Sequence, residues 1–117
     1  MKAIIEVSKR GSAIRAARQQ LAESRQGRVP DFRLSFESAR MLFSELTPAR
    51  VDLLDTLRRV GACSVYALAK AAERNYSNVH SDVARLEELG LIERTEDGSI
   101  LVPYEAVEIL LPLAQVA

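Results

Sequence analysis

The segment 77–102 most constrains the fold, because its apolar residues change from a helical spacing to that of two short strands. In the helical part the apolar residues are four, three and three positions apart, at Val79, Val83, Leu86 and Leu89. This spacing predicts one amphipathic helix that Gly90 ends. The strand part, 91–95 and 99–102, flanks the dipeptide Asp97-Gly98, which favours a tight hairpin turn. The apolar stripe of the helix needs other elements of the chain to cover it.

Two further helices are predicted upstream of this segment. Thr47-Pro48 combines a hydroxyl N-cap with proline at the first helical position, and Gly61 ends the helix that follows. Its expected inward residues are Val51, Leu53, Leu54, Leu57 and Val60. Ser64 is expected to cap the next helix, whose inward residues are Val65, Leu68, Ala69 and Ala72. Pro103 is expected to open a last helix that carries Val107, Leu110 and Leu111.

The N-terminal part of the chain has a different pattern. Alternation at Ala3, Ile5 and Val7 and again at Phe32, Leu34 and Phe36 predicts two strands. Between them, Ser12 is expected to cap a helix that carries Ile14, Ala17 and Leu21. A short helix over 38–46 follows, with Ala39, Leu42, Phe43 and Leu46 inward. We therefore expect a mainly α (α+β) protein. A strand–helix–strand extension, residues 1–35, precedes a winged helix-turn-helix domain, residues 36–117.

Charge is unevenly distributed along the chain, although the formal net charge is zero. Residues 1–29 contain seven basic side chains and two acidic ones, which leaves nine basic and fourteen acidic in residues 30–117. A basic N-terminal segment is compatible with an arm that faces nucleic acid. It is equally compatible with arginines that solvate one helix face. Both interpretations stay open on the sequence alone.

Composition excludes several classes of site and location. A single cysteine, Cys63, excludes an internal disulfide and a cysteine-based zinc site, and it suits a reducing cytoplasm. No apolar run is long enough to cross a bilayer, and the first residues do not resemble a signal peptide. No glycine-rich phosphate loop or nucleophile–base pair is apparent. We expect a cytoplasmic protein that is not an enzyme and that uses no metal or other cofactor.

The helix predicted over 77–89 also carries the candidate binding residues. Its inward stripe leaves Asn78, Ser81 and Arg85 on the outward face, flanked by Ser77, His80 and Ala84. Short polar and basic side chains suit base edges and phosphates in a major groove. Asn75 or Ser77 is expected to cap this helix, and Tyr76 is a further candidate for phosphate contact or for core packing. Asp82 is expected to pair with Arg85 or another basic residue.

The predicted hairpin offers one more candidate, Arg94, which could contact a minor groove together with Thr95. Glu93, Glu96 and Asp97 make the same hairpin acidic, which argues against contact with DNA. Binding of RNA is less favoured, because the sequence shows no aromatic platform or glycine-rich clamp.

Residues 36–103 resemble a small prokaryotic family of winged-helix regulators related to the MarR type. The resemblance rests on the motifs LTPxRxxLL, SVYxLA, RNYxNVHxDVxxLExLGLI and VPY. It extends to the N-terminal segment, since the family carries a similar one. It implies a transcriptional regulator that binds double-stranded DNA. Some members of the family are similar to antitoxins encoded beside a small toxin gene.

Two functions are consistent with these features of the sequence. The first is a sequence-specific regulator that acts as a homodimer and represses its own promoter, with the basic N-terminal segment strengthening DNA binding. Candidate dimer contacts are the apolar groups Ala3/Ile5/Val7, Ile14/Leu21 and Val107/Leu110/Leu111. The alternative is an antitoxin-like module whose partner is a toxin protein.

Overall fold

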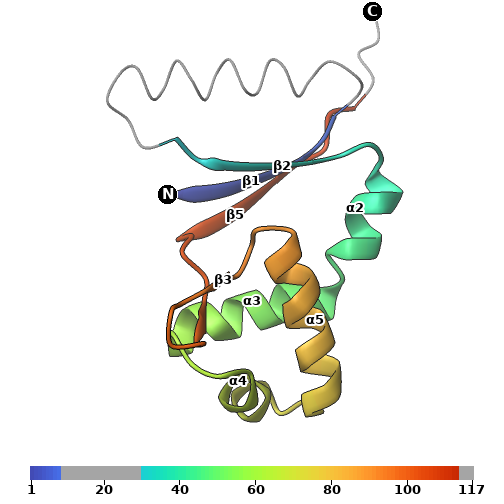
Figure 1. Ribbon diagram of the computed structural model, residues 1–117. Helices are drawn as coiled ribbons and strands as arrows, with labels where there is room; N and C mark the ends of the chain where they lie inside the picture. The colour runs from blue at the N-terminus through green and yellow to red at the C-terminus, as the bar shows by residue number, and fades with distance from the viewer. Residues whose placement is uncertain (9–29, 114–117) are drawn as a thin grey trace, which may run out of the picture. The chain divides into compact units, whose positions relative to one another are not determined.

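The computed structural model describes residues 1–8 and 30–113 (Figure 1). Two compact units divide the chain. One consists of Met1–Glu45 together with Tyr104–Ala117, and the other is Leu46–Pro103. These bounds differ from the expected division at residue 35, because a C-terminal segment pairs with the first strand. The helix expected after Ser12 lies outside the described residues.

A three-stranded parallel sheet forms the first unit. Its strands are β1 (Lys2–Val7), β2 (Phe32–Phe36) and β5 (Ala106–Leu110), in the order β2-β1-β5. Both N-terminal strands are therefore confirmed. Ala3 and Ile5 of the central strand are fully buried. The register places Ala3 between Phe32 and Val107, and Ile5 between Leu34 and Ile109, so these residues share one apolar face of the sheet.

The expectation of a last helix after Pro103 is wrong, because residues 106–110 form strand β5. Val107 and Ile109 are β-branched and favour a strand. The open edge of β1 then supplies the backbone partners. The segment before β5 is held to β1 by the hydrogen bond from Glu105 N to Met1 O, 3.1 Å long. Tyr104 stacks on Phe32 with ring centroids 5.4 Å apart.

Helix α2 (Ala39–Glu45) completes the first unit and confirms the short helix expected over 38–46. Ser38 caps it, since Ser38 Oγ accepts a 3.1 Å hydrogen bond from Met41 N. The helix packs against β1 and β2. Leu42 is fully buried, as expected, but Ala39 is exposed and the ring of Phe43 is 51% exposed. The inward face of α2 is therefore narrower than the sequence pattern suggested.

Three helices and a hairpin form the second unit. They are α3 (Pro48–Val60), α4 (Val65–Ala72), α5 (Tyr76–Glu88), β3 (Glu93–Arg94) and β4 (Ile100–Leu101). Helix α4 packs against both α3 and α5. The three amphipathic helices and the capping roles of Thr47 and Ser64 are confirmed. Gly61 ends α3 with a φ of 84°, a conformation that favours glycine.

The core of this unit is formed by the apolar stripes of the helices and by residues around the hairpin. Its most deeply buried side chains are Leu53, Leu57, Leu68, Val79, Val83, Leu86, Leu91, Ile92 and Ile100. Val51 and Val60 were expected inward on α3 but are 43% and 48% exposed. Thr56 is buried in addition, and its hydroxyl donates to the carbonyl of Asp52 within the helix. The buried face of α3 is thus centred on Leu53 and Leu57.

The hairpin is shorter than the sequence pattern indicated. Leu91 and Ile92 were expected in a strand, but they are buried in the turn that follows α5. Strand β3 therefore has two residues, which pair antiparallel with β4. Cys63 forms an isolated bridge to Ile100, with backbone hydrogen bonds of 3.1 and 2.8 Å. Burial raises the pKa of the Cys63 thiol, in keeping with a small side chain used for packing.

Candidate nucleic-acid interface

The turn between α4 and α5 sets the direction in which α5 begins. Glu73 ends α4 in the left-handed conformation, with φ 54° and ψ 44°, and its N–H group donates to the last carbonyls of the helix. Asn75 then caps α5, since its side-chain oxygen accepts a 3.2 Å hydrogen bond from Asn78 N. Of the two cap candidates, the structure selects Asn75, and Ser77 lies within the first turn.

The outward face of α5 carries the polar residues that the sequence analysis singled out. Asn78 and Ser81 are exposed, as are Ser77 and His80. The inward stripe of Val79, Val83 and Leu86 is confirmed, because none of these side chains is more than 1% exposed. Arg85 is half-buried, and its Nη1 lies 2.9 Å from Glu88 Oε2 one turn further along the helix. The face is thus polar at its N-terminal end and carries an ion pair at its C-terminal end.

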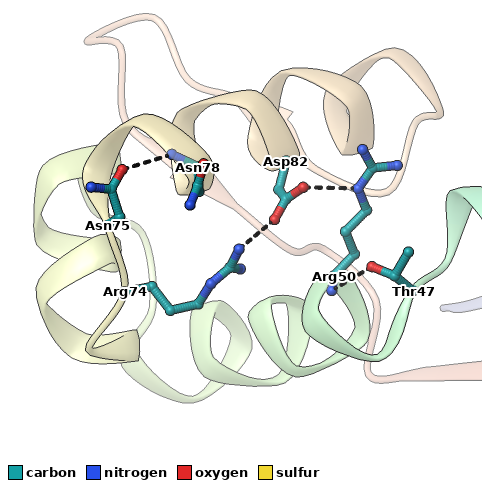
Figure 2. A network of polar contacts seen from close by, with 6 residues as sticks. All are labelled: Thr47, Arg50, Arg74, Asn75, Asn78 and Asp82. Atoms are coloured by element: carbon teal, nitrogen blue, oxygen red, sulfur yellow. Dashed lines mark hydrogen bonds and ion pairs between the residues drawn. The ribbon is translucent and has the colours of Figure 1, made fainter.

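Asp82 joins α5 to two other parts of the unit (Figure 2). Its Oδ1 accepts a 3.0 Å hydrogen bond from Arg50 Nε on α3, and its Oδ2 accepts a 2.8 Å bond from Arg74 Nη2 in the α4–α5 turn. The three side chains are 16%, 19% and 28% exposed for Asp82, Arg50 and Arg74. This ion-pair network fixes the rotation of α5 about its axis relative to α3 and to the turn.

The expected pairing of Asp82 with a basic residue is confirmed, but the partners are Arg50 and Arg74 and not Arg85. The sequence pattern favoured Arg85, which is three residues away on the same helix, or another basic residue. Arg50 is 32 residues away in sequence, and only the packing of α3 against the unit brings its guanidinium to Asp82. Burial of the Asp82 carboxyl acts to raise its pKa. The hydrogen bonds and charges of Arg74 and Arg50 lower the pKa by more than burial raises it, so the net shift is downward. Asp82 therefore stays ionised at neutral pH.

An exposed aromatic cluster lies beside the N-terminal end of α5. Tyr66 on α4 and Tyr76 on α5 are 61% and 49% exposed, and their ring centroids are 6.4 Å apart. The ring of His80 is 5.9 Å from that of Tyr76, and Lys70 Nζ lies 5.6 Å from the centre of the Tyr66 ring. These exposed rings are tilted against one another by 49° for Tyr66 and Tyr76 and by 44° for Tyr76 and His80.

Two residues of this cluster, Tyr66 and Lys70, were missed by the sequence analysis. A signal was present, because they are four residues apart and lie on the face of α4 opposite the buried Leu68. The ring of Tyr76 is exposed, so the alternative that Tyr76 packs in the core is wrong. Lys70 adds a positive charge 5.6 Å from the centre of the Tyr66 ring.

The hairpin carries exposed acidic side chains, and its arginine, Arg94, binds other groups of the same unit. Arg94 Nη2 lies 3.0 Å from Glu87 Oε1 on α5, and Arg94 Nη1 donates to the carbonyl of Gly98. Glu93, Glu96 and Asp97 are all exposed. The hydrogen bond from the Thr95 hydroxyl, followed by that from Ser99, lowers the pKa of Asp97. Arg94 thus stabilises the hairpin against α5.

Within residues 1–8 and 30–113, no three His, Cys, Asp or Glu side chains gather closely enough to hold a metal ion. No helix among the described residues is long and apolar enough to cross a membrane.

Comparison with known proteins identifies the family. Residues 45–109, more than half of the chain, match the model of the HVO_A0114 family, and the chain belongs to that family. The matched region spans the three helices and the hairpin of the second unit and continues into β5. No curated protein matches the chain.

One solved structure is similar to this chain. It is described as "Mechanism for regulation of DNA binding of Bordetella bronchiseptica BpsR by 6-hydroxynicotinic acid". The sequence identity is 24% and the TM-score is 0.44. The alignment covers 82% of this chain but 65% of the other, so this chain spans less than two thirds of that protein's length.

Proposed function

We propose that this protein is a sequence-specific regulator of transcription that binds double-stranded DNA through α4, the turn and α5, as a winged helix-turn-helix. The observation that carries the proposal is the division of α5 into two faces. Val79, Val83 and Leu86 are buried, whereas Asn78 and Ser81 face solvent at the end of the helix that follows the turn. A recognition helix contacts base edges with the N-terminal residues of such a face.

Each outward residue has a defined chemistry in this proposal. Asn78 suits bidentate hydrogen bonds to adenine, while the hydroxyl of Ser81 suits either a base edge or a phosphate. Arg85 can contact guanine if its guanidinium leaves Glu88, with which it pairs in the free protein. The exposed cluster of Tyr66, Lys70, Tyr76 and His80 lies beside this face and suits the sugar-phosphate backbone.

Specificity requires that α5 keep one orientation while it contacts DNA. The hydrogen bonds of Asp82 to Arg50 and Arg74 supply this constraint, because they come from two different elements. They also neutralise a carboxylate that would otherwise repel phosphates. In the proposed complex Arg94 is a minor contributor, since Glu87 and the Gly98 carbonyl already occupy its guanidinium.

The proposal includes a homodimer that represses its own promoter at an imperfect palindrome. Two copies related by a twofold axis would contact two half-sites about one helical turn apart. The basic residues Arg15, Arg18 and Arg25 lie outside the described residues, and a role for them in DNA binding stays part of the proposal. So do a cytoplasmic location and action without an enzymatic step or cofactor.

Selection of DNA fragments by the full chain, from a library that includes its own upstream region, tests this function. A recovered consensus bound with a steep negative dependence of log affinity on log salt is the expected result. Weak binding of all fragments at about 0.15 M salt would contradict it. That outcome would favour the second candidate, an antitoxin-like module that binds a toxin protein. The acidic hairpin of Glu93, Glu96 and Asp97 is the feature that favours that candidate.

A further inference from the structure

Strand β5 is an edge of the parallel sheet that is left uncovered. It pairs with β1 on one side, and in the part of the chain that the structure describes no segment pairs with its other side. All five residues of β5 are exposed, including Val107 at 40%, Ile109 at 45% and Leu110 at 54%. Their neighbours Ala3 and Ile5 on β1 are fully buried. The apolar face of the sheet therefore continues from a buried centre to an exposed edge.

This edge lacks the usual protection against pairing with another chain. Exposed edge strands commonly carry lysine, proline or an unpaired charge that prevents edge-to-edge association. Residues 106–110 contain no proline and no basic residue. The one charged side chain, Glu108, forms a 3.0 Å ion pair with Lys2 on β1. The edge is thus apolar and electrically neutral, which suits a partner of the same character.

We propose that β5 pairs with β5 of a second copy of this chain, antiparallel about a twofold axis, so that two three-stranded sheets become one continuous sheet. The proposal rests on the homodimer proposed above and names the surface that forms it. A second copy is the occupant that fits, because it brings an identical apolar strand of matching length with its charge already neutralised. The backbone groups of the free edge gain hydrogen bonds in the same step.

The charges on β5 exclude one register of the pair, and its apolar residues favour another. Residues directly opposite each other lie on the same face of a sheet. The twofold axis therefore passes midway between the two copies of one residue, which lie opposite each other. An axis at Glu108 would place two carboxylates opposite each other, which is destabilising. An axis at Ile109 sets Ile109 against the partner's Ile109 and Val107 against the partner's Leu111. Glu108 then faces the partner's Leu110, and no like charges are opposed.

Disulfide trapping tests both the surface and the register, without DNA. In the full chain Cys63→Ser removes the native thiol, and Ile109→Cys then places one thiol at the proposed axis. Opposite residues of antiparallel strands have Cα atoms about 4.5–5.5 Å apart, within reach of a disulfide. Mild oxidation is expected to convert most of this variant to a covalent dimer. The matched control, Ser35→Cys on the opposite edge strand β2, is expected to stay monomeric.

Equal or absent trapping of the two variants would overturn the proposal, as would more efficient trapping through Glu108→Cys than through Ile109→Cys. A wild-type chain that sediments as a monomer at about 100 µM, well above the micromolar range of stable dimers, would do the same. DNA binding is measured separately, so failed pairing through β5 leaves the DNA-binding part of the proposed function standing. A monomeric wild type would contradict the proposed homodimer as well.

A second measurement uses charge on the strand. The double variant Val107→Lys, Ile109→Lys places like charges across the axis, and it is expected to weaken self-association by at least about tenfold. Both side chains are already more than a third exposed, so the monomer is expected to tolerate lysine. Leu113→Lys is the control, since Leu113 is 86% exposed and lies beyond the strand. Unchanged self-association of the double variant would contradict the proposal.

Discussion

Asp82 Oδ2 accepts a 2.8 Å hydrogen bond from Arg74 Nη2, which ties the middle of α5 to the turn that precedes it. Arg50 Nε binds the other oxygen of the same carboxylate at 3.0 Å. One acidic side chain thus joins α3, the turn and α5. The orientation of the candidate DNA-contacting face depends on this carboxylate.

We predict that Asp82→Asn lowers the free energy of unfolding by about 1–3 kcal/mol, because it removes the charge of a half-buried carboxylate that binds two guanidinium groups. Urea denaturation of the full chain measures this change. Asp55→Asn is the matched control, since Asp55 pairs with Arg59 on α3 while its side chain is 78% exposed. The control is expected to change stability by less than about 0.5 kcal/mol. Equal effects of the two substitutions would contradict the prediction.

The contribution of Asp82 also defines a pH dependence. Its pKa is lowered in the folded protein, so the stabilisation is fully present above the unfolded-state pKa of about 4 and is lost as the pH falls through the lower folded-state value. The difference in stability between wild type and Asp82→Asn should therefore be constant from about pH 7 to 5 and shrink below about pH 4. Urea titrations at several pH values measure it. A difference that already declines above pH 5 would mean that the pKa of Asp82 is not lowered.

The cap of α5 gives a third prediction. Asn75→Ala should destabilise the protein by about 1 kcal/mol, because the N–H group of Asn78 loses its side-chain acceptor. Ser77→Ala, two residues later, should change stability by less than about 0.5 kcal/mol. Thermal or urea unfolding compares the two. The reverse order of effects would show that Ser77 is the cap.

The outward face of α5 is tested by affinity for a selected operator. Asn78→Ala should weaken binding by about 1–3 kcal/mol through loss of a bidentate base contact. Ser81→Ala and Arg85→Ala should also weaken operator binding more than binding to random DNA. Fluorescence anisotropy at fixed salt measures each affinity, and an unchanged thermal melting curve shows that the fold is intact. Wild-type affinity in all three variants would remove this face from the interface.

We expect substitutions of two basic residues, Lys70 and Arg94, to have different effects on the salt dependence of DNA binding. If Lys70 contacts a phosphate, Lys70→Gln should weaken binding to operator and random DNA alike and reduce the salt slope by about one unit. Arg94→Gln should leave the slope unchanged, because Arg94 is bound to Glu87 and to the Gly98 carbonyl. Salt titrations of both variants measure the slopes. A smaller slope for Arg94→Gln with a wild-type slope for Lys70→Gln would place the hairpin, and not α4, at the phosphates.

Much of the second unit could be predicted from local signals. The cap residues Thr47 and Ser64, the end of α3 at Gly61 and the buried stripe of α5 depend on interactions between residues close in sequence. The hairpin was correctly placed but overestimated in length, because Leu91 and Ile92 are apolar for packing and not for strand pairing. Local periodicity cannot distinguish these two reasons for an apolar residue.

The sequence by itself determined the three helices, the hairpin turn and the polar face of α5, because hydrophobic periodicity and capping act within a few residues. Only the tertiary structure decided that residues 106–110 form a strand, since the partner that stabilises it is β1, about a hundred residues earlier. The tertiary structure likewise brought Arg50 to Asp82 and Tyr66 to Tyr76. Such contacts depend on how separate helices and strands pack together, and the spacing of residues along the chain does not predict that packing.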